Sequence, residues 1–384
     1  MQLPSFENHA LPPMAEALRG DLRAFLREAL RGLSPATRSQ SWMGFDAEFS
    51  ERLGAQGWIG MTWPRQFGGQ ERTALERYVV LEELLAAGAP VGAHWIADRQ
   101  TGPVLLRYGN QEQRERFLPA IAQGKCFFCI GMSEPDSGSD LASIRTTAKW
   151  SEGDGGWILN GTKVWTTSAH LCHFMVTLVR TGTDPKARHD GLSQLIVELG
   201  SPGVTVRPIK DLAGGHHFNE VVFQNAFVPD SRRIGEEGQG WNQVMAELAF
   251  ERSGPERYLS SFQLLEQLVT LAGREPRERV AVTLGRLIAR ARTLRAMSIS
   301  VAGMLEAGQD PSLEAAVVKD LGTNFEQELP ELAHDLFGRE PTDGGSDDFL
   351  QVLAYLTQHA PSFSLRGGTR EILRGIIARG LGLR

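Results

Sequence analysis

The sequence predicts an α+β multidomain protein with an N-terminal helical domain, a central β-barrel or sandwich domain and a C-terminal helical bundle. Apolar residues recur at helical spacing up to about residue 125 and again after residue 233. Between these regions, short β-branched and aromatic runs alternate with Gly, Asp and Pro. A length of 384 residues suffices for two or three domains with a sizeable core. We therefore expect domains at 1–125, 126–233 and 234–384.

The N-terminal domain is expected to be helical because apolar residues repeat on one face with charges between them. Thr73 is a plausible N-cap, and Glu76 three residues later is its capping-box partner. Gly124 is placed to end the last of these helices. The pattern predicts helices over residues 21–31, 45–57, 73–87 and 111–122.

The central domain is expected to consist of short strands. The dipeptide Asn160-Gly161 is a strong short hairpin signal, and it predicts that the second and third strands form a hairpin. Even spacing of such strands favours a compact barrel or sandwich. The predicted strands cover residues 127–132, 157–159, 163–165, 174–179, 192–198, 204–209 and 220–227.

The C-terminal domain is expected to return to helices. Pro255 cannot donate to the carbonyl of Glu251, so the first helix should bend or end there. In the last helix we expect Ile372 and Leu373 on the inner face, with Ile376 and Ile377. Further helices are predicted at 280–304, 314–329, 349–358 and 369–380. The arginines of 286–295 either face a phosphate across a subunit interface or form a solvated helix face.

Composition excludes several classes of function. A net charge of −6 argues against nucleic acid as the main partner, which would require a large basic footprint. Three cysteines imply no disulfide framework, and Cys126 and Cys129 lack a second ligand pair, so we expect core residues and no metal. We find neither a signal peptide nor an apolar run of about 20 residues, so no membrane partner and a cytoplasmic location are expected.

Two stretches carry the chemistry that the residues themselves indicate. Residues 131–140 (Gly-Met-Ser-Glu-Pro-Asp-Ser-Gly-Ser-Asp) offer backbone N–H groups and Ser hydroxyls to an anion or a polar ring edge. Residues 160–167 place an aromatic ring and two hydroxyls just beyond the Asn-Gly pair. Together they indicate a wall for a flat cofactor that has polar edges and phosphates.

The chain resembles the acyl-CoA dehydrogenase family over nearly its whole length. Residues 131–140 look like the first signature of the family, and 157–167 look like its flavin-stacking segment. Phe218-Asn219-Glu220-Val221-Val222-Phe223 looks like the exit from the β-domain, with the later Gly240-Trp241. Gly-Gly-Thr-Arg-Glu-Ile-Leu-Arg at 367–374 looks like the C-terminal signature. Four such motifs in order make the resemblance specific.

This resemblance implies FAD, bound between the β-domain and the C-terminal helices. A carboxylate would remove the α-proton of an acyl-CoA while the β-hydrogen leaves as hydride to flavin N5, which gives a trans-2-enoyl-CoA. Hydrogen bonds to the thioester carbonyl would stabilise the enolate. The residues that the resemblance places at the cofactor are Ile130, Met132, Ser133, Ser139, Trp165, Thr166, Thr167, Thr369 and Glu371.

The proposed general base is Glu251. Many members of the family carry the base directly before the Gly-Thr of the C-terminal signature, but Gly367 stands there in this chain. Members similar to the isovaleryl- and long-chain-type enzymes carry Glu on the first helix after the β-domain, directly before Arg, and Glu251-Arg252 matches that pattern. Glu247, one turn earlier on the same face, is the alternative base.

The resemblance also implies substrate contacts and partners. Ser139, Arg252, Gly367 and Gly368 are the expected substrate-binding residues, and the missing side chain at Gly367 leaves room for a branched or bulky acyl group. The Arg-x-Phe-Gly and Gln-x-x-Gly-Gly motifs of the family are not evident near 274–279 and 338–348. We therefore expect a homodimer or homotetramer, or an α2β2 pair, that passes electrons to an electron-transfer flavoprotein.

Two alternatives remain open from the sequence. One is a flavin monooxygenase or a nitroalkane-oxidase-like member of the same fold. The other is a subunit whose FAD site is completed by a partner chain. The acyl group itself depends on the shape of the cavity and is not encoded in any motif.

Overall fold

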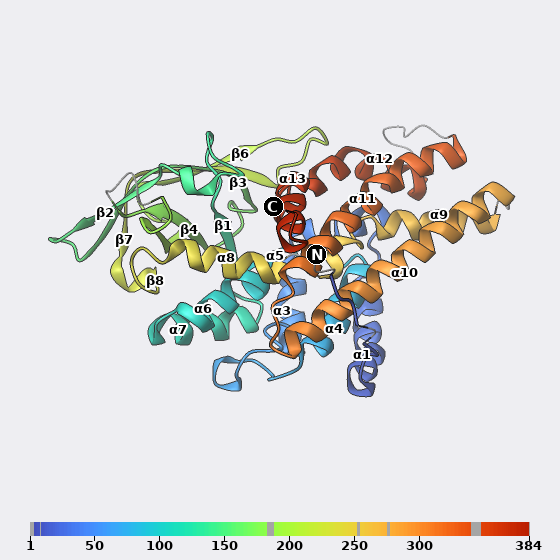
Figure 1. Ribbon diagram of the computed structural model, residues 1–384, viewed down its shortest axis with the longest axis horizontal. Helices are drawn as coiled ribbons and strands as arrows, with labels where there is room; N and C mark the ends of the chain where they lie inside the picture. The colour runs from blue at the N-terminus through green and yellow to red at the C-terminus, as the bar shows by residue number, and fades with distance from the viewer. Residues whose placement is uncertain are drawn as a thin grey trace. The chain divides into compact units, whose positions relative to one another are not determined.

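A computed structural model describes residues 4–7, 9–182, 188–251, 254–274, 277–338 and 347–383, and only the main chain of 247–251. Figure 1 shows the elements coloured in chain order, with helices before and after one sheet. The chain divides into two compact units. Unit 1 comprises residues 1–44, 72–91 and 251–384, and unit 2 comprises 45–71 and 92–250. The helices of the N-terminal third are therefore shared between the two units.

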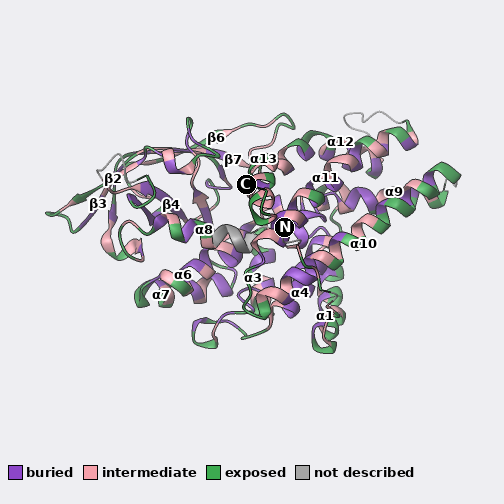
Figure 2. Cartoon of the chain, viewed as in Figure 1, coloured by how far each residue is buried: buried purple, intermediate pink, exposed green. Residues whose placement is uncertain are grey.

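Unit 1 is helical in its described part. Its central helix α4 is buried along nearly its whole length (Figure 2), and α1 and α10 pack against it. The helices of unit 1 are α1 (Pro13–Ala29), α2 (Pro35–Arg38), α4 (Ala74–Ala86), α9 (Phe262–Arg274), α10 (Glu278–Glu306), α11 (Ser312–Phe337), α12 (Asp348–His359) and α13 (Arg370–Gly380).

Unit 2 combines short helices with the sheet. Its helices are α3 (Ala47–Ala55), α5 (Gly92–Ile96), α6 (Gly102–Tyr108), α7 (Gln111–Ala122) and most of α8 (Gly240–Glu251). Its strands are β1 (Phe128–Gly131), β2 (Thr147–Ser151), β3 (Gly156–Thr167), β4 (Phe174–Arg180), β5 (Leu192–Glu198), β6 (Val204–Ile209), β7 (Phe218–Pro229) and β8 (Arg233–Ile234).

The helix ends confirm the capping predicted from the sequence. Thr73 accepts from the N–H of Glu76, whose side chain accepts from the N–H of Thr73, so the capping box of α4 is complete. Asn110 and Gln113 form a second capping box at the start of α7, which runs over the predicted residues. In the last helix, Leu373 is buried, but Ile372 is 41% exposed, so its predicted inward position was wrong.

The central sheet is open, which corrects the expected barrel or sandwich. The strand order is β6-β7-β3-β2-β4-β5-β8, and β1 pairs with β4. The β1–β4 and β2–β4 pairs are parallel and the others antiparallel, so the sheet is mixed. Within the described residues the two ends of this path, β6 and β8, do not pair. The spacing of short strands gave their positions but carried no information about closure.

The hairpin predicted at Asn160-Gly161 is also wrong. β3 continues through these residues as one strand and pairs with β7 on both sides of a register shift between Leu159 and Gly161. A Cβ at Gly161 would lie 2.5 Å from the Thr146 hydroxyl oxygen, so glycine permits a close approach here instead of a reversal. The Asn-Gly signal therefore marks a β-bulge.

The helix that follows β8 ends before Pro255. α8 ends at Glu251, and Pro255 opens a 3-10 turn at Pro255–Arg257, so the helix ends before the proline and does not bend through it. The Cys126 and Cys129 thiols are buried, as expected for core residues. Among the described residues, none of the helices combines the length and the apolar composition that crossing a bilayer requires.

A partly buried charge network joins α1, α4 and α10 in unit 1. Arg19 lies 2.5 Å from Glu83 and 2.8 Å from Glu82, Arg23 lies 2.7 Å from Glu83, and Arg295 lies 2.6 Å from Glu82. Burial alone would raise the pKa of Glu83, but the hydrogen bonds from Arg23 and Arg19 outweigh it and lower that pKa. The stabilisation from Glu83 is therefore present above the unfolded pKa of about 4.3 and is lost as the pH falls.

We predict that Glu83→Gln lowers the free energy of unfolding by about 2 kcal/mol at pH 7, because Arg19 and Arg23 each lose one charged partner. The difference between variant and wild type should shrink as the pH falls toward 4. Urea unfolding at several pH values measures both effects. Glu71→Gln is the control, because its pair with Arg65 is exposed and should contribute less than about 1 kcal/mol. A difference independent of pH would contradict the lowered pKa.

Candidate active site

Unit 2 brings its two predicted cofactor motifs together. β1 leads directly into the loop 131–140, and β3 runs beside the start of that loop. The N–H of Val164 donates to the carbonyl of Ser133 at 2.9 Å, which joins the two motifs through the main chain. Ile130, Met132 and Ser133 are half-buried next to this contact, so each leaves part of its surface open to a ligand.

A buried ion pair lies behind this junction. The Lys163 ammonium group, which is fully buried, donates to Glu134 Oε1 at 2.9 Å and to the carbonyl of Met132 at 3.0 Å. Glu134 also accepts from the N–H groups of Arg145 and Thr146 at 2.6 and 2.9 Å. Burial lowers the pKa of Lys163 to about 8, although Glu134 opposes this shift. The pair fixes the main chain at Met132, on the proposed cofactor side of the loop.

Trp165 is an exposed aromatic ring at the end of the same strand. Its side chain is 60% exposed, and its φ of 58° lies in the left-handed region, where a bulky residue is uncommon. Its ring packs edge-on against Phe218, with centroids 6.0 Å apart. Thr166 is fully buried and its hydroxyl has no hydrogen-bond partner among the described residues, whereas Thr167 is half-buried. The strand therefore presents Trp165 and Thr167, but not the side chain of Thr166, toward its open surface.

The loop after Ser133 is stabilised by its own hydroxyls. Ser137 is buried and donates to the carbonyl of Asp140 at 2.6 Å. Ser139 is exposed, and Asp140 pairs with Arg188 at 2.8 Å. Ser139 is therefore free of the loop's internal packing, as a ligand contact would require.

The C-terminal motif forms a tight turn in unit 1. Gly367 and Gly368 have φ values of 65° and 96°, both in the left-handed region that favours glycine. The carbonyl of Gly368 accepts from the buried Lys319 of α11. Thr369 is the N-cap residue of α13, and Glu371 is exposed, with its pKa lowered by its own backbone N–H and by the Thr369 hydroxyl. The two central residues of this turn therefore contribute main-chain atoms alone.

The proposed base occupies the last position of α8. Glu251 lies there, and the side chains of Glu247 and Glu251, with all of Arg252, are outside the described residues. Their assigned roles stay predictions. Of the arginines of 286–295, Arg290 pairs with Glu328 and Arg295 with Glu82, so these two side chains have partners inside the chain.

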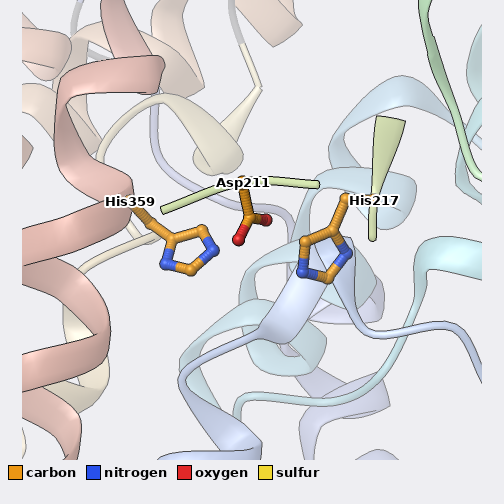
Figure 3. A group of neighbouring side chains, drawn as sticks. All are labelled: Asp211, His217 and His359. Atoms are coloured by element: carbon orange, nitrogen blue, oxygen red, sulfur yellow. The ribbon is translucent and has the colours of Figure 1, made fainter. Parts of the chain in front are cut away.

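Two potential metal ligands share the connection between β6 and β7. A carboxylate oxygen of Asp211 and a ring nitrogen of His217 lie within 4.8 Å of each other (Figure 3). Two ligands fall short of the three or four that a zinc site needs. His359, also labelled in Figure 3, belongs to unit 1, where its Nδ1 donates to the carbonyl of Tyr355 at 2.9 Å. The described residues of unit 2 therefore form no complete metal site at this connection.

The sequence reasoning missed the buried charges behind both motifs. Lys163, Glu134 and Lys319 were not assigned a role, because charged residues in a loop or an amphipathic helix are ordinarily solvated. A signal was present at Lys163, since it begins the predicted strand 163–165 and Glu134 lies in the adjoining motif. No comparable signal marked Lys319, whose partner lies 49 residues away.

Comparison with known proteins identifies the family of this chain. Models of the acyl-CoA dehydrogenase N-terminal, middle and C-terminal domains match residues 12–125, 129–226 and 238–382. The acyl-CoA dehydrogenase IpdE1 of Mycobacterium tuberculosis is 36% identical over 382 residues, which cover 96% of this chain and 97% of that protein. The chain belongs to the acyl-CoA dehydrogenase family and is an oxidoreductase of that type.

Solved structures share the fold. The Tcur3481-Tcur3483 steroid ACAD aligns with a TM-score of 0.87 and 27% identity, over 98% of this chain and 99% of that one. The ChsE4-ChsE5 complex from Mycobacterium tuberculosis aligns with a TM-score of 0.84 and 28% identity, over 98% and 100%.

The cofactor of the chain is FAD. Structures of the same fold include an FAD complex of PigA, which is 25% identical. The surface described above fits such a group, because the exposed Trp165 ring offers a flat apolar face beside partly open hydroxyl and backbone groups at Ser133 and Thr167. We expect the residues around Trp165 to contact the ring system and the loop 131–140 to contact its polar edges.

We predict that Lys163→Met weakens FAD retention and lowers the free energy of unfolding by about 3–5 kcal/mol, because it leaves the Glu134 carboxylate buried without its partner. Adding Glu134→Gln should restore most of the stability. Flavin absorbance per chain after gel filtration, with urea unfolding, measures both effects. Lys149→Met, at an exposed lysine of β2, is the matched control. Full flavin retention in Lys163→Met would show that the pair does not orient the loop.

Proposed function

We propose that the chain dehydrogenates an acyl-CoA thioester between Cα and Cβ to give a trans-2-enoyl-CoA. The observation that carries this proposal is the exposed Trp165 ring beside the junction of β3 with the loop 131–140. FAD, when bound, accepts the β-hydrogen as hydride at N5. The chain's own residues then have three tasks, which are to remove the α-proton, to bind the thioester carbonyl and to exclude water.

Glu251 removes the α-proton in this proposal. Its place at the end of α8, four residues before the Pro255 turn, supports the assignment. Gly367 leaves the C-terminal turn without a carboxylate, so the base must come from another element. A thioester α-proton is a weak acid, so the carboxylate needs an environment that raises its pKa and an adjacent site that stabilises the enolate.

The turn at Gly367 supplies the carbonyl site in this proposal. Its left-handed backbone and missing side chain let a thioester approach the main chain of the turn closely. Arg252, Gly368 and Ser139 contact the rest of the substrate, and Thr369 and Glu371 contact the phosphates or ribose of the cofactor.

The proposed substrate carries a branched or ring-bearing acyl group. The missing side chain at Gly367 leaves room beside the thioester. The similarity to the Tcur3481-Tcur3483 steroid ACAD supports a bulky group of this kind.

The proposed assembly joins at least two subunits of this fold. ChsE4-ChsE5 is a complex of two named components, and Tcur3481-Tcur3483 carries two names as well. These neighbours support an α2β2 pair over the homodimer or homotetramer. An electron-transfer flavoprotein is the proposed electron acceptor, and the cytoplasm is the proposed location.

We predict that Glu251→Gln binds FAD and acyl-CoA but reduces the flavin about 10³-fold more slowly, because the amide cannot accept the α-proton. Anaerobic stopped-flow absorbance of the flavin measures this rate. Glu247→Gln, one turn earlier on the same helix, is the control and should reduce the flavin at a rate near that of wild type. The reverse result, with Glu247→Gln slow and Glu251→Gln normal, would reassign the base.

We also predict that acyl-CoA thioesters with branched or ring-bearing chains reduce the flavin faster than butyryl-CoA, because a short chain leaves the space beside Gly367 unfilled. An anaerobic screen of thioesters at equal concentration measures the order. The screen is run on the chain alone and together with the product of a neighbouring gene, which also tests the need for a partner. A preference for short straight chains would contradict the assignment of a bulky substrate.

A further inference from the structure

One face of α11 contacts two separate segments of unit 1. Lys319, Gly322 and Glu326 follow one another at spacings of three and four residues, so they lie on the same side of the helix. All three are buried, and the Lys319 and Glu326 side chains are fully so. A buried stripe with one cation, one glycine and one carboxylate is unusual, because isolated charges are costly to bury.

The first segment that this stripe contacts is 255–261, which follows the proposed base. Glu326 Oε1 accepts from the N–H of Ser260 at 2.7 Å. The hydroxyl of Ser261 donates to the carbonyl of Glu326 at 3.1 Å. Gly322 packs so closely that a Cβ there would lie 2.1 Å from the carbonyl oxygen of Arg257. The segment after Glu251 therefore rests on α11 through its main chain.

The second segment is the Gly367-Gly368 turn. Glu326 Oε2 accepts from Arg366 Nη2 at 2.9 Å, and Lys319 donates to the carbonyl of Gly368. The same Arg366 nitrogen lies 2.7 Å from the Ser260 hydroxyl and 3.2 Å from the carbonyl of Glu256. Arg366 thus contacts the first segment and the carboxylate at once.

Aromatic rings restrict the Arg366 side chain further. Its guanidinium carbon lies 4.5 Å from the ring centroid of Trp42 and 4.4 Å from that of Phe363. A planar guanidinium that packs over aromatic rings loses much of its rotational freedom. A buried ion pair is weak evidence for stability in itself, because desolvation offsets much of the attraction. The hydrogen bonds that the Glu326–Arg366 pair makes to the two segments therefore indicate its role better than its contribution to stability does.

We propose that the Glu326–Arg366 pair, with Lys319, is a positioning device that fixes segment 255–261 relative to the Gly367-Gly368 turn. The inference rests on the proposed function, in which the first segment follows the proton acceptor in the chain and the second carries the donor to the thioester carbonyl. All three side chains contact main chain, and Glu326 and Arg366 also contact each other. They therefore act through those segments and are positioning residues. A small displacement of either segment would separate the base from the carbonyl site, and displacements of about 1 Å can cost roughly 100-fold in rate.

The test uses the double variant E326Q/R366M in the full-length FAD-loaded protein. The amide introduced at position 326 keeps an acceptor for the N–H of Ser260, and the thioether side chain introduced at position 366 keeps an apolar group against the two rings. Both buried charges therefore leave together at similar volume. We expect a melting temperature and an FAD content near those of wild type, an unchanged KM and a kcat lower by roughly 100-fold. R366K keeps the charge without the planar guanidinium, so its kcat should lie between that of wild type and that of E326Q/R366M.

The matched control is E328Q/R290M, which removes a half-exposed ion pair between Glu328 of α11 and Arg290 of α10. It should leave kcat unchanged. Hydrogen exchange measured by mass spectrometry gives a second readout without catalysis. We expect faster exchange of the amides of 255–261 and of 366–370 in E326Q/R366M, and of neither segment in the control.

The outcomes separate this inference from the proposed function. An unchanged kcat in E326Q/R366M, or faster exchange in one segment or in neither, overturns the positioning role. If none of the acyl-CoA thioesters reduces the flavin of the wild-type protein, the proposed function fails. The exchange data alone then decide whether the two segments depend on this pair. G322A is an independent check, because its Cβ must displace the carbonyl of Arg257 and should raise exchange in 255–261 first.

Discussion

Two segments to which we assign a functional role, the loop 131–140 and the Gly367-Gly368 turn, each contact a buried charge. The cost of burying that charge restricts the geometry of the segment. Lys163 lies behind the loop 131–140 in unit 2, and Glu326 lies behind the Gly367-Gly368 turn in unit 1. Each has a partner of opposite charge and at least one main-chain hydrogen bond. A buried charge tolerates few geometries, since any movement leaves it unsatisfied. The buried charges therefore restrict the conformation of the loop 131–140 and of the Gly367-Gly368 turn where they contact the main chain.

Local signals in the sequence were sufficient for most elements and insufficient for their pairing. β5 and β6 begin and end where the alternation of residues predicted, and the capping box at Thr73 and Glu76 formed as expected. The Asn160-Gly161 hairpin failed because β7 is long enough to pair with both halves of β3. Asn-Gly favours a reversal only when the two flanking strands have no better partner, and that depends on residues some 60 positions later.

The site could be predicted at the level of motifs but not of contacts. The sequence placed Met132, Ser133 and Trp165 together, and the hydrogen bond from Val164 to Ser133 joins their segments. Thr166 was expected beside them, yet strand alternation buries its side chain. The stripe on α11 escaped notice because a helix face with Lys319 and Glu326 reads as solvated, and its partners come from distant segments.

The loss of a carboxylate at Gly367 changes what the C-terminal turn has to do. A turn that carried the base would place a reacting side chain, and packing around that side chain would help to hold it. A turn of two glycines has no side chain to pack and is free to adopt many conformations. On the proposed assignment the base lies on α8 and the turn contributes only an N–H, so its geometry must be imposed from outside. Arg366 before the turn, Lys319 beneath it and the Arg370–Asp320 pair after it supply that support, and all three contacts lead to α11.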